Sequence, residues 1–297
     1  MKRRSESIRD KLLPAGAFLL ILLIWWGISA SGLVPGYMLP SPADVIRAFV
    51  TDFPNLMAHA WVSLEEALLG LGIGTLLAFG LACAMDRFLN LERAVLPLLV
   101  VSQTIPTIAI APLLVLWMGF GVEPKITLVV ITTFFPIAVG LLDGFKSVDP
   151  DAVSLLRSMG AKRGQVFRHV KFPAALPYFF AGLRISASYA VVGAVISEWL
   201  GGFEGLGVYM TRMRKAYAFD KMFAVILLVV IVSLLLMKLV TFIRKISMPW
   251  LRIQPETSVQ KQPEKNEQRK ETITHEEQNH LPAAGCAAGL RGLRGIR

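Results

Sequence analysis

Cysteine and histidine are scarce in this chain: its 297 residues include 2 cysteines and 4 histidines. Cys83 lies in an apolar run and Cys286 in a polar tail, so the sequence predicts no disulfide framework. His275 and His280 stand alone in the same tail, and we expect no metal site there. The sequence contains neither G-x-S-x-G nor G-x-x-x-x-G-K-S/T, which disfavours a serine hydrolase and a phosphate-binding loop in this chain.

Charged residues are also few, at 18%, and the apolar residues gather in long runs. The chain is 54% apolar, and its mean hydropathy is +0.57. A membrane-spanning helix needs about 20 mostly apolar residues. The sequence therefore predicts an all-α, polytopic membrane protein with about six transmembrane helices, at residues 12–33, 60–85, 94–118, 126–142, 178–200 and 222–243. None of these runs contains histidine, which disfavours a membrane enzyme that depends on a nucleophile–base pair.

The first apolar run follows a basic segment, residues 1–11, and secretory signal peptides show the same order. Ile28-Ser29-Ala30 resembles a weak cleavage site. Because the run is longer than the apolar core of a typical signal peptide, we predict an uncleaved first span.

The net charge of +10 points to membrane loops rather than to nucleic-acid binding. Cytoplasmic loops of membrane proteins carry an excess of Lys and Arg. With the N-terminus inside, the inner segments hold most of these residues, and the outer segments hold Arg47, Lys125, Arg212, Arg214, Lys215 and Lys221. The sequence therefore predicts a multi-pass protein with both termini in the cytoplasm. The last outer loop is more basic than this rule prefers.

Composition divides the chain into a cytoplasmic segment at 1–11, a membrane domain at 12–249 and a cytoplasmic tail at 250–297. The tail is rich in Gln, Glu, Lys and Thr, so we expect it to be disordered. Between the first two spans, Ser41-Pro42 predicts a helix start. The apolar residues that follow recur at helical spacing and predict a short amphipathic helix along the outer surface: Val45, Ile46, Phe49 and Val50.

The stretch SLLRSMGAKRGQVFRHVKFPAALP, residues 154–177, is a basic loop between the fourth and fifth spans, within a longer connection at 143–177. Asp149-Pro150 predicts a helix start and Gly160 its end. One face of this helix is apolar, with Ala152, Val153, Leu155, Leu156 and Met159.

A second short helix is expected from Gln165, closed by Pro173 and Pro177 before the fifth span. Such a pair of helices forms either a docking surface for a partner or a solvated connection near the lipid headgroups. The residues alone leave both interpretations open.

The spacing in this loop resembles that of bacterial ABC-importer permeases, whose loop carries a glycine, then an apolar-x-x-P-x-x-x-P ending. Gly160 matches the glycine, Val170 the apolar position, and Pro173 and Pro177 the prolines. Ser154, Leu155 and Leu156 stand where the family has E-A-A, so that part departs from the general pattern.

Other segments resemble the nitrate, sulfonate and taurine group of these permeases: VPGYMLPSPADVIRAF, LLVVSQTIPTIAIAPLLVLWMGFG and AGLRISASYAVVGAVISEWLGG. In the second of these, Pro106 and Pro112 are expected to break the helix. EWLGGFEGLGVYMTRMRKAY looks more like permeases assigned to pyrimidine precursors of thiamine. Together the resemblance covers about residues 34–243.

The resemblance implies the type I ABC-importer permease fold in a bacterial inner membrane, and a transport subunit rather than an enzyme. The implied partners are an ABC ATPase subunit, an extracytoplasmic solute-binding protein and a second permease copy. ATP would be used by the partner subunit, and this chain would bind no cofactor, metal or nucleic acid. The implied solute is small and organic, a hydroxymethylpyrimidine-like compound, with sulfonate, taurine or nitrate as the alternative. The implied ATPase-docking loop comprises Leu155, Leu156, Arg157, Met159, Gly160, Ala161, Lys162, Arg163, Pro173 and Pro177.

Polar residues inside the predicted spans are candidates for the solute pathway, because such groups are costly in lipid. The candidates are Gln103, Thr104, Ser188, Tyr189 and Glu198. The alternative role for each is a hydrogen bond between helices. A channel is the remaining rival class, and it would conduct without ATP.

Overall fold

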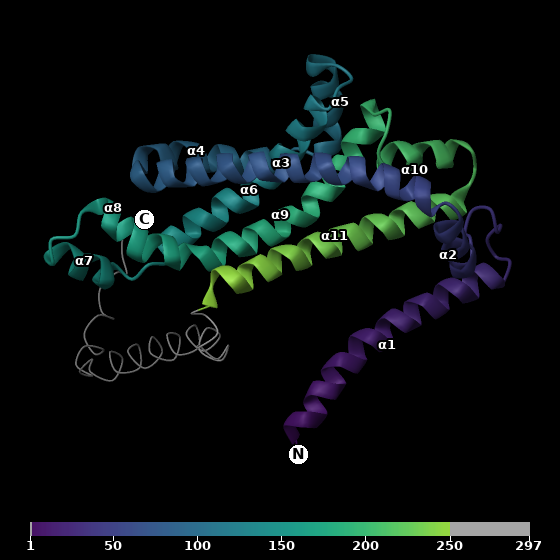
Figure 1. The fold of residues 1–297 in the computed structure, drawn as a ribbon, viewed down its shortest axis with the longest axis horizontal. Helices are drawn as coiled ribbons and strands as arrows, with labels where there is room; N and C mark the ends of the chain where they lie inside the picture. Colours follow the sequence, from purple (N-terminus) through teal and green to yellow (C-terminus); the bar gives the residue numbers. More distant parts are fainter. Residues whose placement is uncertain (1, 250–297) are drawn as a thin grey trace, which may run out of the picture. The chain divides into compact units, whose positions relative to one another are not determined.

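The computed structural model of this protein describes residues 2–249, and the polar tail predicted at 250–297 lies outside them. The described residues are almost entirely helical and contain no strand, which confirms the predicted all-α class (Figure 1). Every helix named below lies in one compact unit, Met1–Ser247. These are α1 (Lys2–Ala30), α2 (Pro42–Thr51), α3 (Phe53–Arg87), α4 (Leu89–Ser102), α5 (Thr107–Met118), α6 (Glu123–Lys146), α7 (Pro150–Ser158), α8 (Arg163–Val166), η1 (Phe167–Lys171), α9 (Phe172–Gly201), α10 (Leu206–Lys215) and α11 (Phe219–Ser247).

Four helical stretches in the described part are long and apolar enough to cross a membrane: α3, α6, the continuous run from α8 to α9, and α11. Counting α4 and α5 as one broken crossing gives five. The predicted number of about six is therefore not matched exactly within the described residues. The first predicted span, residues 12–33, falls in α1, a helix of 29 residues whose apolar segment includes Gly16–Ala30. It ends there because Ser31 and Gly32 form a turn, with Gly32 at φ 72°.

The third predicted span, residues 94–118, is a pair of helices that meet at an angle of 100°. The break falls between α4 and α5, where Pro106 is the residue before the first turn of α5. Proline has no N–H and disfavours helical geometry at the residue before it, so the helix ends at this point. Pro112 lies inside α5 and does not interrupt it, contrary to expectation.

The helices α3, α6 and α9 form the centre of the unit, and α6 and α9 share its most extensive contact. Glycines let these helices approach closely. A Cβ atom added at Gly182 of α9 would lie 2.4 Å from the carbonyl oxygen of Pro136 in α6, and one at Gly144 would lie 2.7 Å from Cα of Ala175. Helices in membranes pack through small residues in this way, because lipid gives no hydrophobic drive for their association.

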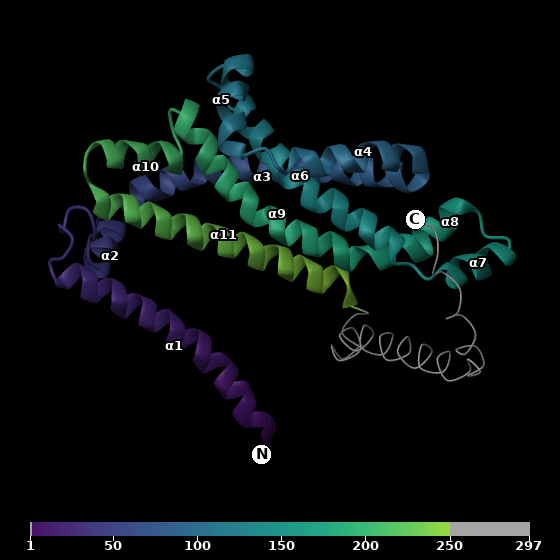
Figure 2. The same cartoon turned by 180° about the vertical axis from the view of Figure 1, so that it is seen from behind.

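The two ends of these long helices carry different elements (Figures 1 and 2). The α7–α8 loop lies at one end, and α2 and α10 lie at the other. Ser41 caps α2 as predicted, since its Oγ accepts the N–H of Asp44 at 3.2 Å. However, α2 is not only a surface helix: Val45 and Ala48 are buried in an apolar cluster with residues of α3, α10 and α11. Ile46 and Val50 remain exposed.

Candidate docking loop and transport pathway

The loop between α6 and α9 is a helix, a sharp turn and a second helix, built by its local sequence. Asp149 caps α7, because its Oδ1 accepts the backbone N–H two residues further on at 2.9 Å. Gly160 has φ 84°, as its predicted helix-ending role requires. Its N–H donates to the carbonyl of Arg157 and the N–H of Ala161 donates to that of Leu156, both at 3.0 Å. These two bonds form a Schellman motif, which satisfies the last carbonyls of the helix.

The predicted apolar face of α7 is split in two by the structure. Leu155 and Met159, one turn apart, are 63% and 77% exposed. The other apolar residues, Ala152, Val153 and Leu156, are half-buried against the protein. Exposed large apolar side chains that lie together at the end of a loop are typical of an interaction surface. Leu155 of α7 and Met159, its C-cap, are therefore the large apolar side chains of this segment that are free to contact a partner, and we call them the apolar tip.

The rest of the predicted docking loop differs from expectation in one respect. Ala161 is half-buried, and Lys162 and Arg163 are exposed. Pro173 and Pro177, however, do not close the second helix before the fifth span, because the helix runs on from Arg163 to Gly201.

A π-helical segment, Phe167–Lys171, makes this continuity possible. Its last bond runs from the N–H of Phe172 to the carbonyl of Phe167. The π turn is wider than an α turn and shifts the backbone hydrogen-bond register just before Pro173. Pro173 has no N–H and donates no bond in this register. Nζ of Lys171 also lies 2.6 Å from Oδ1 of Asp86, so this segment is tied to the end of α3.

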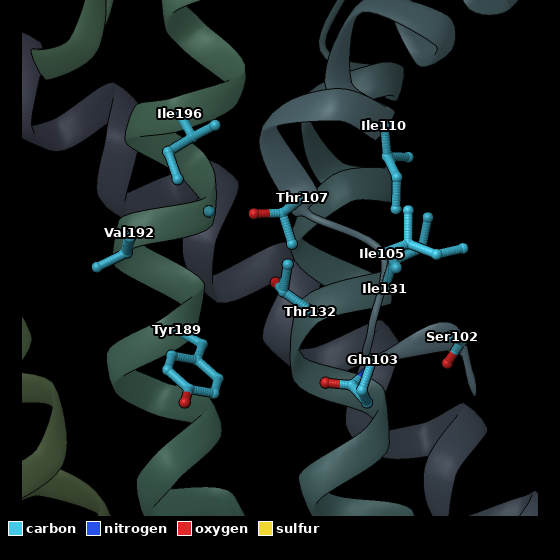
Figure 3. A pocket seen from close by; sticks show the side chains of 11 residues that line it. Ser102, Gln103, Ile105, Thr107, Ile110, Ile131, Thr132, Tyr189, Val192 and Ile196 are labelled. Atoms are coloured by element: carbon cyan, nitrogen blue, oxygen red, sulfur yellow. The ribbon is translucent and has the colours of Figure 1, made fainter. Parts of the chain in front are cut away.

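A cavity of about 280 Å³ opens beside the break between α4 and α5 (Figure 3). Gln103 and Tyr189, both predicted pathway residues, extend into it from opposite sides. The other polar residues in its lining are Ser102, Thr107 and Thr132. Most of the remaining lining residues are isoleucine and valine. None of the 11 lining residues is charged. We call this space the central cavity.

Two further pathway candidates stand near the central cavity without lining it. Thr104 is exposed in the link between α4 and α5, and its Oγ1 donates to the carbonyl of Val101 at 2.7 Å. Ser188 is half-buried on α9, next to Tyr189. The central cavity thus brings together two of the five predicted residues.

Glu198, the fifth candidate, lies elsewhere and is 1% exposed. Its Oε1 accepts the hydroxyl proton of Ser63 and its Oε2 accepts the N–H of Gly207, both at 2.6 Å. The N–H of Leu206 in turn donates to Oγ of Ser63 at 2.8 Å. Gly205 has φ 119°, and a Cβ there would collide with the carboxyl group of Glu198. This arrangement fastens the start of α10 to α3 and α9.

A buried ion pair lies on α3 and α6, and the sequence did not predict it. Nζ of Lys125 is 2.6 Å from Oε1 of Glu66, and the side chains are 8% and 4% exposed. Oε2 of Glu66 has no hydrogen-bond partner among the described residues. The signal in the sequence was the Glu65-Glu66 pair within an apolar run, since a carboxylate placed there requires a counter-charge. The distance of 59 positions between the partners hid which cation supplies it.

A polar cluster around Asp52 also holds α10, through Tyr209 in its first half. The hydroxyl of Tyr209 donates to Asp52, Nδ2 of Asn55 donates to its Oδ1 at 2.7 Å, and Nζ of Lys221 lies 3.4 Å from its Oδ2. Partial burial alone would raise the pKa of Asp52, but these donors outweigh it and lower the pKa below its ordinary value. Within residues 2–249, no group of three or more His, Cys, Asp or Glu side chains is placed to hold a metal.

Comparison with known proteins gives consistent matches over most of the chain. The profile of the family described as "Binding-protein-dependent transport system inner membrane component" matches residues 71–253. The formylaminopyrimidine transport permease protein ThiX of Halalkalibacterium halodurans is 36% identical over 256 residues, which cover 86% of this chain and 100% of that protein. SsuC of Bacillus subtilis, named for aliphatic sulfonate transport, is 30% identical over 253 residues, or 84% and 90% of the two chains. An inward-facing structure of the MetNI methionine ABC transporter has a similar fold, with a TM-score of 0.57 and 20% identity over 65% of this chain and 96% of that one.

Proposed function

Since this chain belongs to the family of binding-protein-dependent transport system inner membrane components, we propose that it carries a small pyrimidine-like solute across the cell membrane. The chain is a membrane-spanning permease subunit of an ABC importer, and the ATPase is a separate chain. It is similar to permeases of the sulfonate and taurine type as well as to a pyrimidine-transport permease. It is therefore a transport subunit and not an enzyme.

The chemistry of the central cavity is the observation that supports a neutral heteroaromatic solute. Its polar groups are one amide and several hydroxyls, which hydrogen-bond to ring nitrogens and amines, and its isoleucines contact a flat ring. A sulfonate or nitrate anion would leave its charge without a cation in this cavity, which is costly away from water. The greater identity with ThiX than with SsuC supports the same choice.

Uptake by cells that express the complete transporter tests the solute and the cavity together. We expect Tyr189→Ala and Gln103→Ala to lower the initial rate of labelled hydroxymethylpyrimidine uptake about tenfold, because each removes a hydrogen bond of about 1 kcal/mol and part of the cavity wall. Phe242→Ala, an exposed aromatic on α11 that lines no described cavity, is the matched control and should transport normally.

Competition experiments distinguish the identity of the solute from the permease function itself. An excess of taurine should leave pyrimidine uptake unchanged. Uptake of taurine in place of pyrimidine would refute the proposed solute while leaving the permease function intact. Normal pyrimidine uptake by both cavity variants would show that the solute does not pass through the central cavity.

The proposed importer contains a second copy of this chain and two further kinds of chain. A second copy of this permease would complete the pathway, a solute-binding protein would deliver the solute from outside, and two ATPase subunits would act at the α7–α8 loop. A solute or partner shifts a two-state transporter only if it binds one state more tightly than the other. The apolar tip, at the opposite end of the long helices from α10, is the proposed site of ATPase contact.

The proposed orientation places the α7–α8 loop and both termini in the cytoplasm. The excess of Lys and Arg in the inner segments supports it. The test uses Gln165→Cys and Glu204→Cys, each in a chain without Cys83 and Cys286, because both positions are exposed and lie at opposite ends of the helices. A membrane-impermeant thiol reagent added to whole cells should label position 204 and leave position 165 unlabelled. The reverse pattern would invert the proposed topology.

A further inference from the structure

A cavity of about 550 Å³ lies between the end of α3 and the α7–α8 loop, and no transport role accounts for it. Its lining includes four cationic side chains, Arg87, Arg157, Arg163 and Lys171. We call it the basic cavity. Cationic groups from two separate parts of the chain converge there, α3 on one side and the loop on the other.

The positive charge of the basic cavity is largely uncompensated. Asp86 is the one carboxylate in its lining, and it is paired with Lys171. Arg87, Arg157 and Arg163 make no salt bridge within the part of the chain that the structure describes. The guanidinium carbon of Arg87 lies 5.4 Å from the ring centroid of Phe88. This contact with an uncharged ring does not neutralise the positive charge of Arg87. Three neighbouring guanidinium groups repel one another, and an anion between them replaces repulsion by attraction.

The basic cavity is distinct from the apolar tip. Successive residues of an α-helix are about 100° apart, so Arg157 lies about 200° around α7 from both Leu155 and Met159. Arg157 and Arg163 line the basic cavity, whereas Leu155 and Met159 do not. A partner bound at the apolar tip therefore leaves Arg157 on the far side of the helix.

The less exposed lining of the basic cavity is apolar. It includes Cys83 and Phe167, and the Phe167 ring lies 5.3 Å from that of Phe145. The cavity also lies where the apolar body of α3 ends at Arg87, which is the depth of the lipid headgroups if α3 crosses the membrane. A cationic rim over an apolar floor at this depth fits an anionic group attached to an apolar body.

We propose that the basic cavity binds a phosphate-bearing anion, supplied by the headgroup of an anionic phospholipid or by a free phosphate compound. Guanidinium groups bind phosphate oxygens in pairs of charge-assisted hydrogen bonds. The bound phosphate joins Arg87 of α3 to Arg157 and Arg163 of the loop, and so holds the loop against the membrane domain. This site goes beyond the proposed transport function and exists whether or not an ATPase binds the apolar tip.

Cys83 is a built-in probe for occupancy, because it is half-buried in the lining of the basic cavity. The full-length Cys286→Ser chain is reconstituted in phosphatidylcholine vesicles, or in vesicles of roughly three parts phosphatidylcholine to one part phosphatidylglycerol. N-ethylmaleimide, which is uncharged, then labels Cys83. We expect labelling about fivefold slower with phosphatidylglycerol, as follows when roughly four-fifths of the sites are occupied.

A pair of matched variants identifies the site. Arg157→Gln with Arg163→Gln should abolish the slowing. Arg93→Gln with Arg168→Gln removes the same charge from exposed positions that do not line the cavity, and should retain the slowing. Each rate is compared between the two vesicle types within one variant, so that a direct effect of the substitutions on the thiol cancels.

Inorganic phosphate added to the phosphatidylcholine vesicles distinguishes the two sources. Slowing by phosphatidylglycerol alone assigns the site to a lipid headgroup, and slowing by phosphate as well assigns it to free phosphate compounds too. Equal labelling under all three conditions would overturn the proposal. So would slowing that persists unchanged in the Arg157→Gln, Arg163→Gln variant.

Discussion

Replacing Lys125 with alanine should destabilise the permease by about 3–5 kcal/mol, which is a large part of the stability of a typical domain. The reason is the carboxylate that it leaves behind. Glu66 is 3% exposed, and its Oε2 already has no hydrogen-bond partner among the described residues. Without Lys125, the carboxyl group of Glu66 would remain buried between α3 and α6. It would lack a counter-charge if it stayed ionised, and a hydrogen-bond partner if it became protonated. We expect a much lower yield of folded protein and a markedly lower melting temperature in detergent.

The control for this experiment removes both charges at once. Lys125→Met with Glu66→Met replaces the ion pair by apolar side chains of similar volume, and such replacements in protein interiors are often neutral. This double variant should recover most of the lost stability. Lys146→Ala breaks a comparable contact with Glu92 at 2.5 Å, but the lysine side chain is 48% exposed, so we expect a loss of about 1 kcal/mol or less. Equal losses from Lys125→Ala and Lys146→Ala would refute the assignment of Lys125 as a buried counter-charge.

The second large effect concerns the apolar tip of α7. Leu155→Asp with Met159→Asp should abolish co-purification of the ATPase subunit, because burial of such a side chain contributes about 1.5–3 kcal/mol and a buried carboxylate reverses that gain. Both residues are exposed in this chain, so the permease itself should fold and reach the membrane. Lys162→Ala, an exposed charge two positions beyond the turn, is the control and should bind the ATPase almost normally.

Gly160→Val separates the shape of the loop from the chemistry of the apolar tip. Gly160 has open space around its Cα, so its requirement is for the positive φ alone. A β-branched residue in that conformation costs roughly 1–2 kcal/mol. We expect weakened ATPase binding with Leu155 and Met159 unchanged.

Full ATPase binding by the Leu155→Asp, Met159→Asp variant would show that the loop is a solvated connection.

Local signals in the sequence predicted much of this structure. Asp149-Pro150, Ser41-Pro42 and Gly160 each act within a few residues of their own position, and each begins or ends a helix as expected. The apolar runs likewise gave the existence of the long helices, because a membrane-spanning helix satisfies its backbone within itself. The break at Pro106 follows from the missing N–H of one residue.

The features that sequence reasoning missed depend on distant partners or on compensation. Glu198 lies 135 positions from Ser63, so its role in fastening α10 required the packing of α3 against α9. Pro173 was expected to end a helix, and the π segment before it allows the helix to continue. The apolar face of α7 was predicted as one surface, but the way the loop sits against the protein exposes only Leu155 and Met159. The angle between α4 and α5, and with it the central cavity, also depends on neighbouring helices.

Photo-crosslinking from the apolar tip tests most directly whether this permease couples to an ATPase through α7. Met159→Cys, in a chain without Cys83 and Cys286, is labelled with benzophenone maleimide and irradiated in membranes that also contain the tagged ATPase. Phe203→Cys is the control, because it is 76% exposed near α10, at the other end of the long helices. We predict an adduct with the ATPase from position 159 and none from position 203. An adduct from position 203, or none from position 159 in an actively transporting complex, would contradict the account.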